Sequence, residues 1–159
     1  MCIRDRAIHY GNNPTVIGWQ IDNEPGHYGV VDYSENAQAK FRIWLQKKYG
    51  TIDKLNDTWG ASFWSETYQN FEQVRLPNQQ EVPDKANPHA MLDLNRFMAD
   101  ELAGFVNMQA DILRRHIHKD QWITTNLIPV FNPVDPVRID HTDFLTYTRY
   151  PVSYTHLTL

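Results

Sequence analysis

Cysteine is almost absent from this chain of 159 residues, with Cys2 as its one example. One thiol excludes an internal disulfide and a zinc site built from several thiolates, although it leaves the cellular compartment open. The formal net charge is -4 and no run of Lys or Arg occurs, which argues against nucleic acid and anionic membranes as partners. No apolar stretch approaches the roughly 20 residues that a membrane-spanning helix requires, so we expect no membrane partner.

The two ends of the chain differ from the rest. Residues 1–6 and 152–159 resemble translated sequencing-adaptor read-through, and neither stretch carries a signal-peptide pattern or a helix pattern. We therefore expect residues 7–151 to be the natural part, although Pro151 fits either side of the junction. In this interpretation the natural part is an internal fragment of a longer protein, and any targeting signal lies outside it.

The most informative stretch is Val-Ile-Gly-Trp-Gln-Ile-Asp-Asn-Glu-Pro-Gly, from Val16 to Gly26. Its first six residues, apolar and partly β-branched, predict a buried parallel strand that ends before the Pro-Gly turn. Asn23 and Glu24 then lie at the carboxyl end of a strand, which is the rim that carries catalytic groups in a (β/α)8 barrel. The alternative is a strand followed by a turn in which Glu24 is merely solvated, but the full run and the helix-rich sequence after it favour the catalytic interpretation.

Helix signals dominate the region that follows. Ser34 has the character of an N-cap and Gly50 that of the residue just past a helix end, so one helix is expected between them. A short second helix is expected to start at Thr51. Asn87-Pro88 predicts the start of a third helix, with a cap and a proline in the first turn, and the apolar pattern continues for roughly 30 residues.

Two further strands complete the expected arrangement, at residues 123–127 and 144–148. A strand, a long helical region, a strand, a short linker and a strand form the order typical of parallel strands covered by helices. The predicted fold class is therefore α/β.

Four blocks of sequence occur in order and with natural spacing. They are Gln20–Gly26, Phe41–Ile52, Leu55–Ser65 and Leu92–Phe97. Together they resemble glycoside hydrolase family 42, the β-galactosidase family, and the resemblance covers essentially all of residues 7–150. It implies that residues 7–151 are a fragment of a catalytic domain with a partial (β/α)8 TIM barrel. In that barrel this chain supplies about strands 4 to 6, with a long helical insertion after strand 4.

The same resemblance implies a retaining glycoside hydrolase that cleaves terminal β-D-galactosides, with a galactoside or oligosaccharide substrate and no cofactor. Glu24 matches the family's acid/base carboxyl, and Asn23 matches the amide that bonds the hydroxyl next to the reacting sugar carbon. Trp64 matches an aromatic residue that reaches the active site of a neighbouring subunit, since the full-length protein is expected to be a homotrimer. Tyr150 matches a tyrosine at the end of the sixth strand that supports the nucleophile. Trp64 could instead be an ordinary core or surface residue, and Tyr150 adjoins the adaptor-like junction.

Two elements of the family pattern are missing. Many members bind zinc through cysteines just after the Asn-Glu pair, but residues 27–33 offer one His and one Asp. Zinc favours four Cys or His ligands, so we predict no structural metal. The nucleophile is expected on the seventh strand, outside this chain. The chain therefore holds the acid/base half of the site and should be inactive alone.

Two alternatives stay open. The Asn-Glu strand end also suits related retaining glycosidases such as a β-glucanase, a β-xylanase or an α-arabinosidase, and only the later blocks favour galactosides. A non-catalytic carbohydrate-binding barrel is the second alternative. An acidic residue at the end of the seventh strand of the complete gene would favour an enzyme over that binding protein.

Overall fold

The computed structural model describes residues 2–26, 30–78, 87–128 and 134–148. These residues belong to two compact units. The first, here called the sheet unit, comprises Met1–Val30 with Ala99–Leu159, and the second, the helical unit, comprises Val31–Met98. Within the described ranges, no helix combines the length and the apolar character needed to cross a bilayer.

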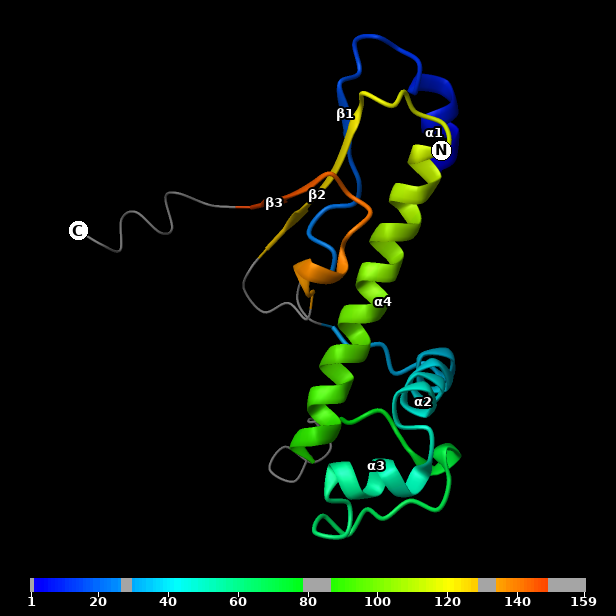
Figure 1. Cartoon of the computed structure of the whole chain (residues 1–159), viewed down its shortest axis with the longest axis vertical. Coiled ribbons are helices and arrows are strands. Elements are labelled where there is room, and N and C mark those ends of the chain that lie inside the picture. The colour runs from blue at the N-terminus through cyan, green and yellow to red at the C-terminus, as the bar shows by residue number, and fades with distance from the viewer. Residues whose placement is uncertain (1, 27–29, 79–86, 129–133, 149–159) are drawn as a thin grey trace, which may run out of the picture. The chain divides into compact units, whose positions relative to one another are not determined.

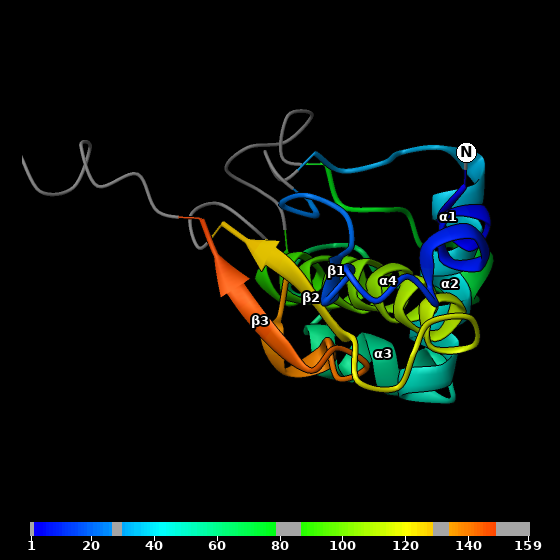
Figure 2. The same ribbon diagram turned by 90° about the horizontal axis from the view of Figure 1, so that it is seen from above.

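The sheet unit contains three parallel strands in the order β1, β2, β3 (Figures 1 and 2). Their bounds are Gly18–Gln20 for β1, Trp122–Leu127 for β2 and Phe144–Tyr147 for β3. The prediction of parallel strands joined by helical and irregular connections is confirmed. Strand β1 is shorter than the expected strand, although its pairing continues past its end, where the Ile21 N–H donates to the Thr124 carbonyl at 2.8 Å.

Close contact between β1 and β2 requires a glycine at position 18. A Cβ atom on Gly18 would lie 2.0 Å from the Trp122 ring, well inside van der Waals contact. The indole of Trp122 thus packs directly over the β1 backbone, and a larger residue at position 18 would force the two strands apart.

A helix covers the sheet and completes the core of this unit. Side chains from the Ala99–Arg114 part of α4 (Pro88–Arg114) pack against the strands. The buried core residues are Ala7, Ile21, Ala103, Val106, Ala110, Leu113, Ile123, Leu127 and Ile139. A short 3-10 helix, η3 (Pro136–Arg138), lies in the connection between β2 and β3.

Helix α1 (Ile3–Tyr10) begins inside the first six residues, so the expectation that this stretch carries no helix pattern is wrong. Two interactions stabilise it. The Asp5 carboxylate accepts a hydrogen bond from the Cys2 N–H at 3.4 Å at the start of the helix, and Ala7 is completely buried in the core.

The helical unit confirms the predicted helix starts. Helices α2 (Glu35–Tyr49) and α3 (Ile52–Trp59) are followed by a 3-10 turn, η2 (Phe71–Gln73), and by the first part of α4. Ser34 Oγ caps α2 by accepting from the Ala37 N–H at 3.2 Å, and Thr51 Oγ1 caps α3 by accepting from the Lys54 N–H at 3.3 Å. Asn87 Oδ1 likewise accepts from the His89 N–H at 3.0 Å. Capping oxygens of this kind satisfy backbone donors that the first helical turn leaves unpaired.

A buried carboxylate joins the three helices of this unit. Asp93 of α4 is 1% exposed, and its Oδ2 accepts from the Tyr49 hydroxyl at 2.5 Å and from Trp59 Nε1 at 3.0 Å. Its Oδ1 accepts from Lys48 Nζ and, at 3.3 Å, from Arg96 Nη1. Two cations and two neutral donors therefore compensate one buried charge, as a carboxylate removed from water requires.

Candidate active site

The carboxyl edge of the sheet unit gathers polar side chains from the ends of all three strands. Because the three strands are parallel, their carboxyl ends lie along one edge. Asn23 and Glu24 follow β1, and Asn126 lies one residue before the end of β2. Thr148 follows β3, and its N–H donates to the Leu127 carbonyl at 2.8 Å. Residues far apart in sequence are thereby brought together at one edge.

The turn that carries Glu24 has an unusual backbone. Asp22 and Glu24 have φ angles of 55° and 48°, in the left-handed region, and Gly26 has a φ of 74°. Only glycine enters this region without a steric penalty, so the two acidic residues each cost roughly 1 kcal/mol or more. The Asp22 carboxylate offsets part of this cost by accepting from the Asn23 N–H at 2.8 Å.

Hydrogen bonds to β2 hold Glu24 in this turn. The Glu24 N–H donates to the backbone carbonyl of Asn126 at 3.2 Å and to the side-chain Oδ1 of the same residue at 3.3 Å. Glu24 is half-buried and Pro25, next to it, is buried. The backbone that presents the candidate acid is therefore tied to the neighbouring strand.

Asn126 is the residue that sequence reasoning missed. Its Nδ2 donates to Asn23 Oδ1 at 3.1 Å and to Thr148 Oγ1 at 2.8 Å. Its Oδ1 also accepts from Gln20 Nε2 at 3.0 Å. A signal was present in the sequence: an asparagine at the end of a predicted strand that should neighbour the strand preceding Asn23.

The structure places the predicted site residues that it describes in different parts of the chain's fold. The structure brings Asn23 and Glu24 to one edge with Asn126, and Asn23 is exposed there. Trp64 belongs to the helical unit, where it is half-buried and its ring lies edge-on to Phe63, 5.2 Å between centroids. Tyr150 lies outside the described residues.

The absence of a structural metal stays a prediction, because His27 also lies outside the described residues. In the described ranges, no group of three or more His, Cys, Asp or Glu side chains is arranged to hold an ion.

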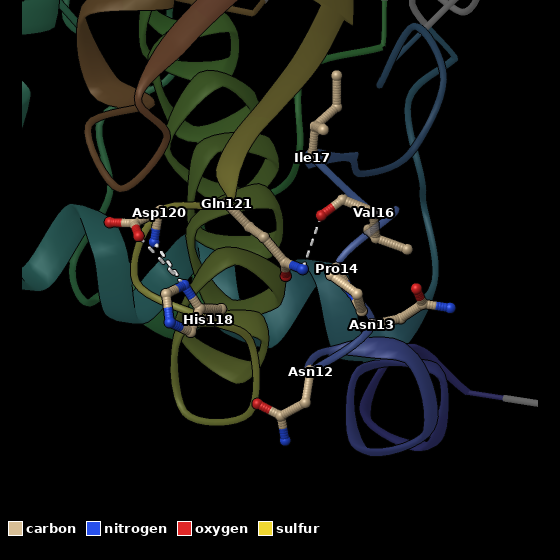
Figure 3. Close-up of a pocket in the computed structure, with 8 residues that line it drawn as sticks. All are labelled: Asn12, Asn13, Pro14, Val16, Ile17, His118, Asp120 and Gln121. Atoms are coloured by element: carbon tan, nitrogen blue, oxygen red, sulfur yellow. Dashed lines mark hydrogen bonds and ion pairs between the residues drawn. The ribbon is translucent and has the colours of Figure 1, made fainter.

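The sheet unit also has an open pocket of about 440 Å³, at the opposite edge (Figure 3). It is lined by Asn12, Asn13, Pro14, Val16, Ile17, His118, Asp120 and Gln121, which lie around the amino ends of β1 and β2. Several of its polar groups are engaged: Gln121 Nε2 donates to the Val16 carbonyl at 2.8 Å, and His118 Nδ1 lies 3.4 Å from an Asp120 oxygen. In a barrel, catalytic groups lie at the carboxyl edge, so the edge that bears Glu24 is the candidate site.

The arrangement at the carboxyl edge is suited to acid/base catalysis on a polar substrate. A carboxyl group next to an exposed amide can transfer a proton while the amide holds a neighbouring hydroxyl. Glycoside hydrolysis is one such reaction: it uses two carboxyls, one of which protonates the leaving oxygen.

Comparison of the sequence with known proteins finds beta-galactosidases. Residues 2–158 match the family model of glycoside hydrolase family 42, described as beta-galactosidase. The chain is 39% identical to the beta-galactosidase BgaA of a Thermus species over 153 residues, which are 95% of this chain and 23% of that protein. A beta-galactosidase of Thermus thermophilus is 37% identical over the same shares of the two chains.

Solved structures of beta-galactosidases are also similar to this chain. The crystal structure of a beta-galactosidase from the psychrophilic Marinomonas ef1 superposes with a TM-score of 0.86 at 36% identity, covering 94% of this chain and 23% of that one. The beta-galactosidase of the haloarchaeon Halorubrum lacusprofundi also gives a TM-score of 0.86, at 30% identity, covering 96% of this chain and 23% of that one. The chain thus spans about a quarter of the length of the relatives that it matches.

Proposed function

Because the chain belongs to glycoside hydrolase family 42, the β-galactosidase family, we propose that it is part of an enzyme that hydrolyses terminal β-D-galactosides with retention of configuration. The observation that carries the proposal is the position of Glu24. This carboxyl lies on a constrained turn at the carboxyl edge of a parallel sheet, directly after an exposed asparagine.

We assign the three strands to about the fourth, fifth and sixth strands of a (β/α)8 barrel. Their parallel order and sequential adjacency support this assignment, as does the location of polar groups at their carboxyl ends. The helical unit is then the insertion that follows the fourth strand. Residues 7–151 belong to the catalytic domain.

The proposed mechanism divides the work between two carboxyls about 5 to 5.5 Å apart. Glu24, protonated at first, donates its proton to the leaving oxygen as a nucleophile from the seventh strand attacks the sugar carbon. The Glu24 carboxylate then removes a proton from the water that releases the glycosyl group. Asn23 bonds the adjacent sugar hydroxyl, an interaction that strengthens as positive charge develops on the ring.

Two further residues have proposed roles in the complete enzyme. Trp64 forms part of the substrate site of a neighbouring subunit in a homotrimer. The 82% exposure of the adjoining Phe63 supports this, since aromatic residues are enriched at interfaces. Tyr150 supports the nucleophile from the end of the sixth strand. Neither role requires a cofactor.

The test is Glu24→Gln in the complete enzyme that contains this segment. Hydrolysis of lactose-like substrates should fall by at least about 100-fold, as expected for the loss of a general acid. A nitrophenyl galactoside should suffer less in its first step, because its leaving group needs little protonation. Added azide should restore turnover by attacking the glycosyl-enzyme directly. Near-normal activity of Glu24→Gln on lactose would overturn the assignment.

The competing functions are distinguished by a substrate panel. Preference for β-galactosides over glucans, xylans and arabinosides supports the proposal, and preference for one of the others identifies a different glycosidase. Binding of sugars without turnover of any substrate indicates a non-catalytic carbohydrate-binding protein.

A further inference from the structure

We propose that Asn126 is a positioning residue that fixes which end of the Asn23 amide faces the sugar. The inference rests on the proposed function, in which Asn23 bonds the hydroxyl next to the reacting carbon and Glu24 is the acid. It assigns a role to a residue at the end of β2, which no substrate-binding pattern in the sequence identifies.

The Asn126 amide has every hydrogen-bonding position occupied. A primary amide offers two donor hydrogens and two acceptor lone pairs. The two hydrogens go to Asn23 Oδ1 at 3.1 Å and Thr148 Oγ1 at 2.8 Å. The oxygen accepts from Gln20 Nε2 at 3.0 Å and from the Glu24 N–H at 3.3 Å. An amide held at four points cannot rotate without losing several bonds at once.

These contacts fix the orientation of both side-chain amides, that of Asn126 and that of Asn23. A backbone N–H can only donate, so the Glu24 N–H, which also donates to the Asn126 backbone carbonyl at 3.2 Å, favours an oxygen at the near end of the Asn126 side chain. The Gln20 Nε2 group, which donates to the same side-chain oxygen at 3.0 Å, favours it as well. Nδ2 must then point towards Asn23, where it requires an acceptor. The acceptor is Asn23 Oδ1. Because this oxygen faces Asn126, the Nδ2 of Asn23 points away from Asn126.

The orientation of the Asn23 amide decides whether a donor or an acceptor faces the sugar. Among the described residues Asn23 Nδ2 has no hydrogen-bond partner, and the side chain is exposed, so a donor is available to the substrate. A hydroxyl has a single proton. When an anionic nucleophile attacks the adjacent carbon, that proton is best given to the nucleophile, and the hydroxyl can then only accept from the amide. A donor facing the sugar is therefore the productive orientation of Asn23.

Asn126→Asp tests the inference because it keeps the shape of the side chain but replaces the donor by an anionic oxygen. That oxygen would repel Asn23 Oδ1 and would favour the flipped amide, with Nδ2 turned towards position 126. The measurement is the ratio of kcat/KM for a nitrophenyl β-galactoside to kcat/KM for its 2-deoxy analogue, which lacks the hydroxyl. Both values come from the same sample of the complete enzyme, so the fraction of folded protein cancels.

We expect this ratio to fall by roughly tenfold in Asn126→Asp, about the effect of one misdirected hydrogen bond. Asn126→Ala, which frees the Asn23 amide to rotate, should lower it in the same direction and serves if the aspartate variant does not fold. Thr146→Val is the matched control: Thr146 pairs with Asn126 across β2 and β3, but its hydroxyl donates to the Thr125 carbonyl at 3.1 Å and takes no part in the four hydrogen bonds of the Asn126 amide. Its ratio should equal that of the wild type.

The outcomes separate this inference from the proposed function. If Glu24→Gln behaves as an acid/base variant but both Asn126 variants keep the wild-type ratio, the role of Asn126 is refuted and the proposed function stands. Equal losses on both substrates also refute it, because they indicate a structural role alone. If Glu24→Gln keeps near-normal activity, the proposed function fails and the role of Asn126 falls with it.

Discussion

Asp93→Asn should loosen the helical unit strongly, although the two side chains have nearly the same shape. In the wild type, Asp93 Oδ2 accepts from the Tyr49 hydroxyl and Trp59 Nε1, and Oδ1 faces Lys48 and Arg96. An asparagine can keep an oxygen towards the two neutral donors only by turning its NH2 group towards the two cations. The substitution therefore replaces a compensated charge by a mismatched set of donors.

The expected cost follows from these contacts. Hydrogen bonds to a charged group contribute about 1 kcal/mol more than neutral ones, and the buried donors of Tyr49 and Trp59 both lose this increment. The ion pair with Lys48, whose side chain is 29% exposed, adds about 1 kcal/mol more because solvent screens it only in part. The free energy of local unfolding should thus fall by about 3 kcal/mol, which corresponds to a roughly 100-fold increase in the population of the open state.

Hydrogen–deuterium exchange of the complete enzyme measures this locally. Amides of α2 and α3 should exchange about 100-fold faster in Asp93→Asn under conditions where exchange reports the opening equilibrium. Asp57→Asn is the control, since it makes the same chemical change at an exposed position of α3. An increase below about threefold, or one matched by the control, would refute the role of the carboxylate.

The pH dependence provides a second check. Burial acts to raise the pKa of Asp93, but the hydrogen bonds from Lys48, Tyr49 and Trp59 outweigh it and hold the pKa below its ordinary value. A carboxyl with a depressed folded pKa stabilises the fold above its unfolded pKa of about 3.9 and loses that contribution as the pH falls through the folded value. The exchange difference between wild type and Asp93→Asn should therefore be complete at neutral pH and shrink below about pH 4. Burial, together with the bond to Asp93, raises the pKa of Tyr49 to about 12, so its hydroxyl remains a donor throughout.

Two other predictions concern assembly and folding. Trp64→Ala in the complete enzyme should raise KM and weaken the trimer by about 2 kcal/mol or more, as truncating an interface tryptophan does; unchanged kinetics together with unchanged sedimentation would leave Trp64 without an interface role. The 159-residue chain alone should be poorly soluble or molten and inactive, because three strands cannot close a barrel and the sheet keeps unpaired edges. A cooperative thermal transition of a soluble monomer would contradict the folding part of this expectation, and galactosidase turnover that disappears in Glu24→Gln would contradict the catalytic part.

Helix starts were predictable from sequence because their signals are local. Ser34 and Thr51 each cap a donor three residues ahead, at 3.2 and 3.3 Å, and such a bond depends on a few adjacent residues. The Asn-Glu strand end was also visible, because a strand pattern, a turn and the polar pair follow one another directly in the sequence.

Contacts between distant segments were not predictable in this way. Asp93 and Trp59 are 34 positions apart, and Asn126 and Asn23 are 103 apart. The first contact depends on how the helices pack, and the second depends on the register of the strands. The residues next to each contact in the sequence determine neither the packing nor the register. The left-handed backbone at Glu24 was hidden for a related reason: glycine or asparagine is the usual sign of such a turn, and glutamate gives none.

With the proposed role of Glu24, that left-handed backbone opposes stability to activity at a single position. Glycine in place of Glu24 would adopt a φ of 48° without strain, so selection for resistance to heat alone would favour losing the carboxyl. Keeping glutamate there means that the rest of the domain must supply the missing free energy, through packing and through the bonds that reach this turn from β2. Efforts to make the enzyme more heat-resistant should accordingly leave residues 22–26 and Trp64 unchanged and seek their gains in the buried core of the helical unit.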